Sequence, residues 1–376
     1  MIKPAEPAPA SDRFITPPLS VALDLLRFVA ALVVLVCHAT QTGLYTGPFP
    51  NVPLAQHYAV VVFFVLSGLV IAASVQNRPT DFTRFMIARA ARILPVSVAA
   101  LAFGTAAYLL VTGFGGSAQQ TDTYGELSWR GTVLPLLFLS ESPWGAGPVW
   151  NPPFWSLCYE VWYYALFGAA VLLRGPARIA ALCLFALLAG PRILVMLPIW
   201  LVGVMLVITP ALRRIGRWSG LALASAGVVA AWYHTTALMP GLRLMKAMAG
   251  AYGDDLSFSR FALSDFLLAL AVAAVIAGLR PVLAVIPRPM LALRSLAQLL
   301  AGFSFTLYLF HWPVLLLAKS AGMSAGDSPL AFAGAIAAIL CLGYAISLGT
   351  EAQKDRVRAA LTAGFSRLAA RRAAPA

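Results

Sequence analysis

Charged residues are scarce in this chain: they make up 11% of its 376 residues, whereas apolar residues make up 60%. Soluble domains carry a charge on about a quarter of their residues, so this composition excludes an ordinary soluble domain. Cysteine is also scarce. All four, Cys37, Cys158, Cys183 and Cys341, fall inside apolar runs rather than in loops, so the sequence predicts no disulfide framework.

The chain contains instead many long apolar runs. A helix needs about 20 apolar residues to cross a bilayer, and the sequence predicts an all-α fold, a polytopic transmembrane helical bundle of about ten spans. The fifth run (177–190) and the sixth run (193–209) are short and separated only by Pro191 and Arg192. The alternative to two spans is that these two runs are tilted or re-entrant segments. The predicted spans cover about 21–41, 56–76, 93–113, 155–173, 177–190, 193–209, 219–237, 261–279, 300–320 and 329–350.

The net charge of +13 is spread over the loops, which argues against a nucleic-acid-binding domain. With the amino terminus in the cytoplasm, 20 Lys and Arg residues fall on inner segments and 6 on outer ones, with Arg27 inside a span. The positive-inside rule therefore predicts that both termini are cytoplasmic. The predicted domains are a disordered cytoplasmic lead (1–20), one membrane domain (21–350) and a basic cytoplasmic tail (351–376).

The longest break in hydropathy, about 114–154, is on the outer side in this topology. It contains Asp122, Glu126 and Glu141, and a loop of this length is usually functional or disordered. Its last residues, PVWNPPFW (148–155), are typical of a helix that enters the membrane at the outer interface, where Trp is enriched.

Three ionisable residues, Asp24, Arg27 and His38, lie inside the first span. Such residues are expensive in a bilayer and are functional candidates by default. Arg27 and His38 are eleven residues apart, so their side chains lie about 20° apart on one helix face, with Asp24 one turn from Arg27. The alternative is an interfacial Asp24–Arg27 pair and a hydrogen-bonded His38.

Two further segments have a functional and a structural interpretation. In FFVLSGLVI (63–71), Ser67 and Gly68 indicate close helix packing, although the Ser67 hydroxyl is also able to line a channel. In RFMIARAARILP (84–95), Arg89 and Arg92 lie one turn apart at the inner start of a helix. Paired guanidinium groups bind phosphates such as those of CoA, or else lipid headgroups.

Two spans contain buried polar residues. Glu160, in WSLCYEVWYYALF (155–167), is expected at about the depth of His38, where it would assist the imidazole or pair with an arginine. In SFTLYLFHWPVLL (304–316), His311 and Tyr308 are one turn apart, and His311 is a second candidate or a packed hydrogen-bonding residue. The histidines show no metal-ligand spacing, so no metal is expected.

Together these motifs resemble the acyltransferase-3 family, multi-span membrane acyltransferases that modify bacterial surface and secreted glycans. Val61 stands where many members have an acidic residue, and Cys158 stands where Ser is common. The matching segments are LDLLRFVAALVVLVCHA (23–39), FFVLSG (63–68), RAAR (89–92) with Pro95, WSLCYE (155–160) and YLFHWP (308–313), with weaker agreement at PIWLVG (198–203) and Glu351.

The resemblance implies an O-acyltransferase of the bacterial inner membrane. It would move an acyl group, acetyl first among the candidates, from cytoplasmic acyl-CoA to a hydroxyl of a glycan or glycolipid such as exopolysaccharide or lipopolysaccharide. The alternative class is a glycan or glycolipid transporter or flippase, for which internal repeats are expected and none is found.

The resemblance also implies a role for each candidate. His38 would be the general base or carry the acyl group, Arg27 would orient the donor and Asp24 would position Arg27. Glu160 would assist on the outer side. The implied donor-binding residues are Arg89, Arg92 and Ser67, and the implied acceptor-binding residues are Trp155, Ser156, Tyr308 and His311.

Overall fold

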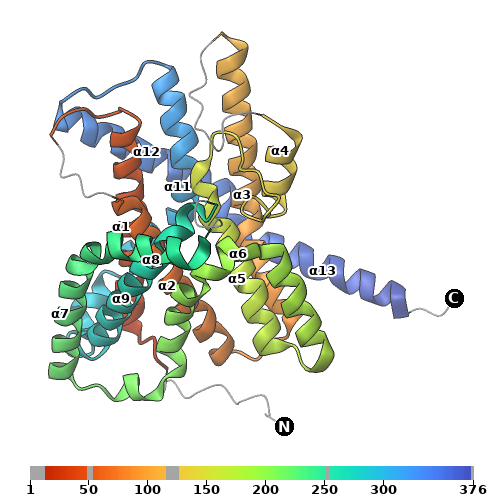
Figure 1. The fold of residues 1–376 in the computed structure, drawn as a ribbon, viewed down its shortest axis with the longest axis vertical. Helices are drawn as coiled ribbons and strands as arrows, with labels where there is room; N and C mark the ends of the chain where they lie inside the picture. Colours follow the sequence, from red (N-terminus) through yellow and green to blue (C-terminus); the bar gives the residue numbers. More distant parts are fainter. Residues whose placement is uncertain (1–12, 49–53, 116–126, 251–254, 374–376) are drawn as a thin grey trace. The chain divides into compact units, whose positions relative to one another are not determined.

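The computed structural model describes residues 13–48, 54–115, 127–250 and 255–373, and all the regular elements in these ranges are helices (Figure 1). Eight helical segments among these residues are long and apolar enough to cross a membrane. The predicted all-α, polytopic fold is therefore confirmed. Asp122, Glu126 and residues 1–12 of the predicted lead lie outside the described residues.

The long helices follow the apolar runs, and all ten predicted spans lie on helical segments. The helices are α1 (Pro17–Gln41), α2 (Ala55–Asn77), α3 (Phe82–Gly113), α5 (Trp155–Leu172), α6 (Gly175–Ile208), α7 (Arg217–Tyr233), α9 (Ala262–Leu283), α11 (Arg294–Ser320), α12 (Pro329–Gly349) and α13 (Lys354–Ala373), with the shorter α4 (Trp129–Leu136), α8 (Leu238–Ala249) and α10 (Pro287–Ala292).

Ten predicted spans correspond to eight spanning segments for two reasons. The fifth and sixth runs join in α6, which is broken at Gly190, where φ is 77°; this left-handed conformation favours glycine, and Pro191 follows it directly. In addition, α5 is not among the eight segments. Its five Trp and Tyr side chains and Glu160 reduce its hydropathy.

The chain divides into two compact units, each made of separate stretches of sequence. Unit 1 comprises residues 1–34, 52–79 and 188–301, and unit 2 comprises residues 35–51, 80–187 and 302–376. Three of the five divisions fall inside helices, namely α1, α6 and α11.

Helices α2 and α6 of unit 1 touch through two glycines. A Cβ atom on Gly68 would lie 2.1 Å from the Trp200 carbonyl oxygen, and one on Gly203 would lie 2.0 Å from that of Val65. Small residues permit such close backbone approach between membrane helices. Ser67 accepts a hydrogen bond of 3.1 Å from Nε1 of Trp200, so it belongs to this packing contact.

The segment before α5, in unit 2, is folded into the protein. Asn151 donates from Nδ2 to the carbonyl oxygen of Leu309 (3.0 Å), while Trp150 is only 2% and Trp155 only 5% exposed. These aromatic residues therefore pack inside unit 2. The turn η2 (Pro152–Phe154), in which Pro153 and Phe154 are buried, leads into α5.

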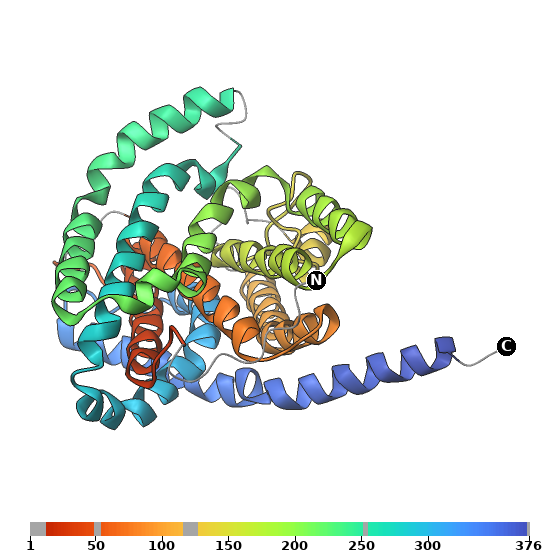
Figure 2. The same cartoon turned by 90° about the horizontal axis from the view of Figure 1, so that it is seen from below.

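The predicted basic tail is helical: η7 (Glu351–Gln353) leads into α13, which packs along α3 in the same unit. Figure 2 shows α13 as the long blue helix that ends at the carboxyl terminus. At the other end, α1 begins at Pro17, so the last four residues of the predicted lead are helical.

Candidate active site

The charged pair of the first span is formed within α1. Nη1 of Arg27 lies 3.9 Å from Oδ1 of Asp24, and both side chains are partly buried. The two residues belong to unit 1, as does Ser67. The other eight candidates, His38, Arg89, Arg92, Trp155, Ser156, Glu160, Tyr308 and His311, belong to unit 2.

His38 is hydrogen-bonded to His311 of α11 in unit 2. Nδ1 of His38 lies 2.8 Å from Nε2 of His311, and Nδ1 of His311 lies 2.6 Å from the Tyr308 carbonyl oxygen. A carbonyl oxygen only accepts hydrogen bonds, so Nδ1 of His311 carries the hydrogen. Nε2 of neutral His311 is then an acceptor, and Nδ1 of His38 must donate to it. The lone pair of neutral His38 therefore lies on Nε2.

His311 thus orients His38, as a third group orients the base in nucleophile and base arrangements. His311 is 1% exposed, whereas His38 is half-buried. The ring of Trp312 meets that of His38 edge-on, with centroids 4.7 Å apart. The structure places His311 beside the predicted base, whereas the resemblance had implied that it binds the acceptor.

Tyr308 and Ser156 form a second polar layer beside His311. Their hydroxyl oxygens are 2.7 Å apart, and the Tyr308 hydroxyl also donates to the Pro153 carbonyl oxygen (3.1 Å). The Tyr308 and His311 rings are 5.9 Å apart. The buried turn η2 therefore holds Tyr308 in place through its backbone.

Glu160 interacts with polar residues of α3, α5 and α11. The Tyr164 hydroxyl donates to Oε1 of Glu160, and both residues interact electrostatically with Arg89. Glu160 also interacts electrostatically with Tyr308. The arginine partner considered as an alternative is Arg89.

Arg89 is the centre of a basic cluster made of Arg89 and Arg92 of α3 and Arg358 of α13, which interact electrostatically. Nε of Arg89 is buried with no hydrogen-bond partner among the described residues. With Glu160 as the one carboxylate among these interactions, the cluster has an excess of positive charge. Guanidinium groups in this arrangement suit a phosphate ligand.

Two contributors were missed by sequence reasoning. Arg358 was assigned only to the basic tail, because contact between α13 and α3 is a tertiary feature. Glu351, noted only as a weak match, is 7% exposed and accepts hydrogen bonds from the backbone nitrogen and hydroxyl of Thr306 (both 3.2 Å). It ties the end of α12 to α11, the helix that carries Tyr308 and His311.

The sequence is also similar to known proteins. Over 155 residues, 39% of this chain, the sequence is 30% identical to Acyltransferase MdmB of Streptomyces mycarofaciens, and the aligned stretch is 38% of that protein. No solved structure matches the chain significantly. Residues 20–348 match the model of the acyltransferase-3 family, described as an acyltransferase domain. This match includes all the candidates from Asp24 to His311, and the chain belongs to the acyltransferase-3 family of membrane acyltransferases.

Proposed function

We propose that this acyltransferase moves an acyl group, acetyl first among the candidates, from cytoplasmic acyl-CoA to a hydroxyl of a glycan or glycolipid. The observation that carries the proposal is the hydrogen-bond chain from the Tyr308 carbonyl through His311 to His38. It leaves the lone pair of neutral His38 on Nε2, as a general base requires. The glycan acceptor is supported by the resemblance of the motifs.

In the proposed reaction, Nε2 of His38 takes the proton of the acceptor hydroxyl while the hydroxyl oxygen attacks the thioester carbonyl carbon. The carbon–sulfur bond breaks, and His38 returns the proton to the departing thiolate. The products are an ester and CoA thiol. His311 keeps Nδ1 of His38 protonated throughout, so the same lone pair is available in the next cycle.

The donor phosphates are assigned to the cluster of Arg89, Arg92 and Arg358. Glu160 and Tyr164 orient Arg89, so Glu160 acts as a positioning residue. Arg27, held by Asp24 on the helix that carries His38, is proposed to orient the acyl donor.

The acceptor is assigned to Trp155, Ser156 and Tyr308, of which Tyr308 lies beside His311 and bonds to Ser156. The distribution of basic residues supports a topology with both termini in the cytoplasm and a location in the bacterial inner membrane.

Transfer by the purified protein tests the proposed function. Proteoliposomes that contain the wild-type chain are given acetyl-CoA labelled in the acetyl group and a glycan with free hydroxyls. The expected result is label in the glycan, in a form that hydroxylamine releases, only when both substrates and protein are present. A flippase would instead move glycan across the vesicle membrane without acyl-CoA, and that movement without labelling would contradict the proposal.

Arg89→Gln is expected to raise the KM for acetyl-CoA by roughly 10- to 100-fold, because hydrogen bonds to charged groups contribute about 1.5–3 kcal/mol. The kcat is expected to change little. The measurement compares acetyl-CoA with acetyl-pantetheine, which has no phosphates, so the variant and the wild type should differ only with acetyl-CoA.

Arg84→Gln is the matched control for Arg89→Gln. Arg84 lies on the same helix, but its side chain is 77% exposed and pairs with Asp81 at 3.2 Å. Its KM for acetyl-CoA should remain that of the wild type. If Arg89→Gln lost the same fraction of transfer activity with acetyl-CoA as with acetyl-pantetheine, Arg89 would stabilise the fold rather than bind the phosphates.

A further inference from the structure

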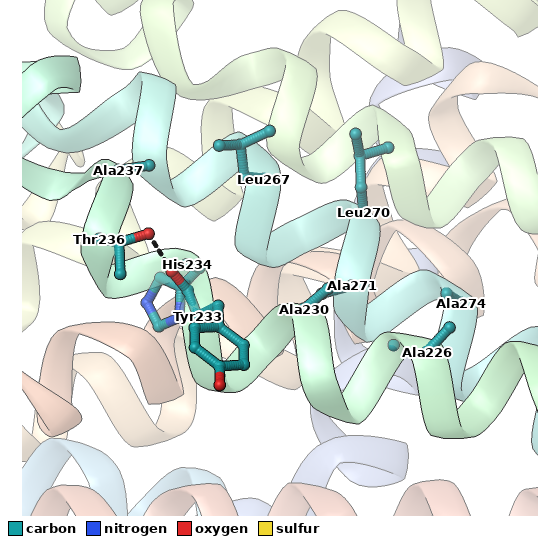
Figure 3. Close-up of a pocket in the computed structure, with 11 residues that line it drawn as sticks. Ala226, Ala230, Tyr233, His234, Thr236, Ala237, Leu267, Leu270, Ala271 and Ala274 are labelled. Carbon is teal, nitrogen blue, oxygen red and sulfur yellow. Dashed lines mark hydrogen bonds between the residues drawn. The ribbon is translucent and has the colours of Figure 1, made fainter.

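A groove runs between α7 and α9 in unit 1, and none of the candidate residues lines it (Figure 3). Its volume is about 460 Å³, within the range of small-molecule sites. Small and apolar side chains line most of it. On α7 these include Ala226 and Ala230, and on α9 they include Leu267, Leu270, Ala271 and Ala274.

The groove opens between two helices that belong to segments long and apolar enough to span a bilayer. Leu267 and Leu270, which line it, are 47% and 46% exposed. Gly227 lets the backbones approach closely, since a Cβ atom on it would lie 2.7 Å from the Ala271 carbonyl oxygen. In this setting the occupant of the apolar part is a hydrocarbon chain.

One end of the groove is polar. His234, which follows α7 directly, lines the groove and is only 8% exposed. Its Nδ1 bonds to the Ala231 carbonyl oxygen, so in the neutral ring Nε2 is an acceptor. Nε2 has no hydrogen-bond partner among the described residues. A buried acceptor without a donor is unfavourable, so a ligand with a donor group is stabilised there.

Asp265 and Tyr58 are neighbours of His234. Asp265 of α9 interacts electrostatically with His234 and holds His57 through Oδ2 (2.7 Å). Its other oxygen, Oδ1, has no hydrogen-bond partner within the described ranges. The Tyr58 ring meets the His234 ring edge-on at 4.4 Å. The unpartnered acceptor at the polar end of the groove is therefore Nε2 of His234, and a hydroxyl is a group that complements it.

We propose that the α7–α9 groove binds a membrane lipid whose head carries a free hydroxyl group. The hydrocarbon chain lies along the small residues of α7 and α9, and the hydroxyl donates a hydrogen bond to Nε2 of His234. This site goes beyond the acyl-transfer function, because none of its lining residues is a candidate for that reaction.

Photolabelling in vesicles tests the proposal. The full-length protein is reconstituted in phosphatidylcholine that contains a diacylglycerol with a diazirine in one acyl chain. After illumination and trypsin digestion, label is expected mainly in the peptides 218–243 and 261–294, which hold α7 and α9. Ala230→Phe, which fills the groove, should lose most of this labelling. The matched variant Ala222→Phe, at an exposed position of α7 outside the groove, should keep it.

The hydrogen bond is tested by methylating the hydroxyl of the same probe. The methylated probe should label the wild-type protein less than the parent probe does. In His234→Ala the two probes should give the same extent of labelling. The proposal is overturned if Ala230→Phe and Ala222→Phe are labelled equally, or if the wild type takes both probes equally. It is also overturned if labelling falls as the protein-to-lipid ratio rises, because a second copy would then cover the groove.

Discussion

Replacing His38 with alanine is expected to lower kcat for acyl transfer by about 100- to 10,000-fold, the range that a general base contributes. The reason is that Nε2 of His38 holds the only lone pair in the His311–His38 chain that remains available to a substrate proton. The measurement is the rate of labelled acetyl transfer at saturating acetyl-CoA.

Thr40→Ala serves as the control for His38→Ala. Thr40 lies on the same helix, and its hydroxyl donates to the Cys37 carbonyl oxygen (2.8 Å), so transfer should stay near the wild-type rate. Elution as a single species in size-exclusion chromatography confirms that both variants are folded. Folded His38→Ala that transfers acetyl at the normal rate would remove His38 from the reaction.

The substitution His311→Leu is expected to lower kcat on the order of 100-fold or more, since it removes the acceptor that fixes the tautomer of His38. The KM for acetyl-CoA should not change, because the phosphates are assigned to a different cluster. His311→Gln keeps an acceptor oxygen within reach of Nδ1 of His38, and it is expected to restore part of kcat.

A double variant separates positioning from folding. If His311 acts only through His38, then His38→Ala with His311→Leu should be no slower than His38→Ala alone, because residues that act as a unit are not additive. If the loss of kcat in the double variant were the product of the two single losses, His311 would act independently of His38. If kcat fell as far in His311→Gln as in His311→Leu, the role of His311 would be packing.

Much of the fold was predictable because the bilayer requires long apolar helices. The runs that become α1, α2, α9 and α12 were identified closely from hydropathy. Local helix geometry also indicated the pairs Asp24 with Arg27 and Tyr308 with His311. These predictions depend on residues close in sequence, for which the helix repeat alone determines the spacing.

Contacts between distant segments were not predictable. His38 and His311 are 273 residues apart, and nothing in either motif specifies that they share a hydrogen bond. The sequence also did not identify which arginine interacts with Glu160. The buried pair of His57 and Asp265 was also missed, although Asp265 lies inside a predicted span and intramembrane acids are functional candidates.

The burial of the segment before α5 has a consequence for biosynthesis. The amide of Asn151 bonds to a carbonyl made 158 residues later, and the Tyr308 hydroxyl that bonds to Pro153 also belongs to α11. While the ribosome is still translating the intervening helices, this polar backbone has no permanent partner. Unit 2 therefore matures after α11 has entered the membrane, and a nascent chain halted before that point retains an unfinished core.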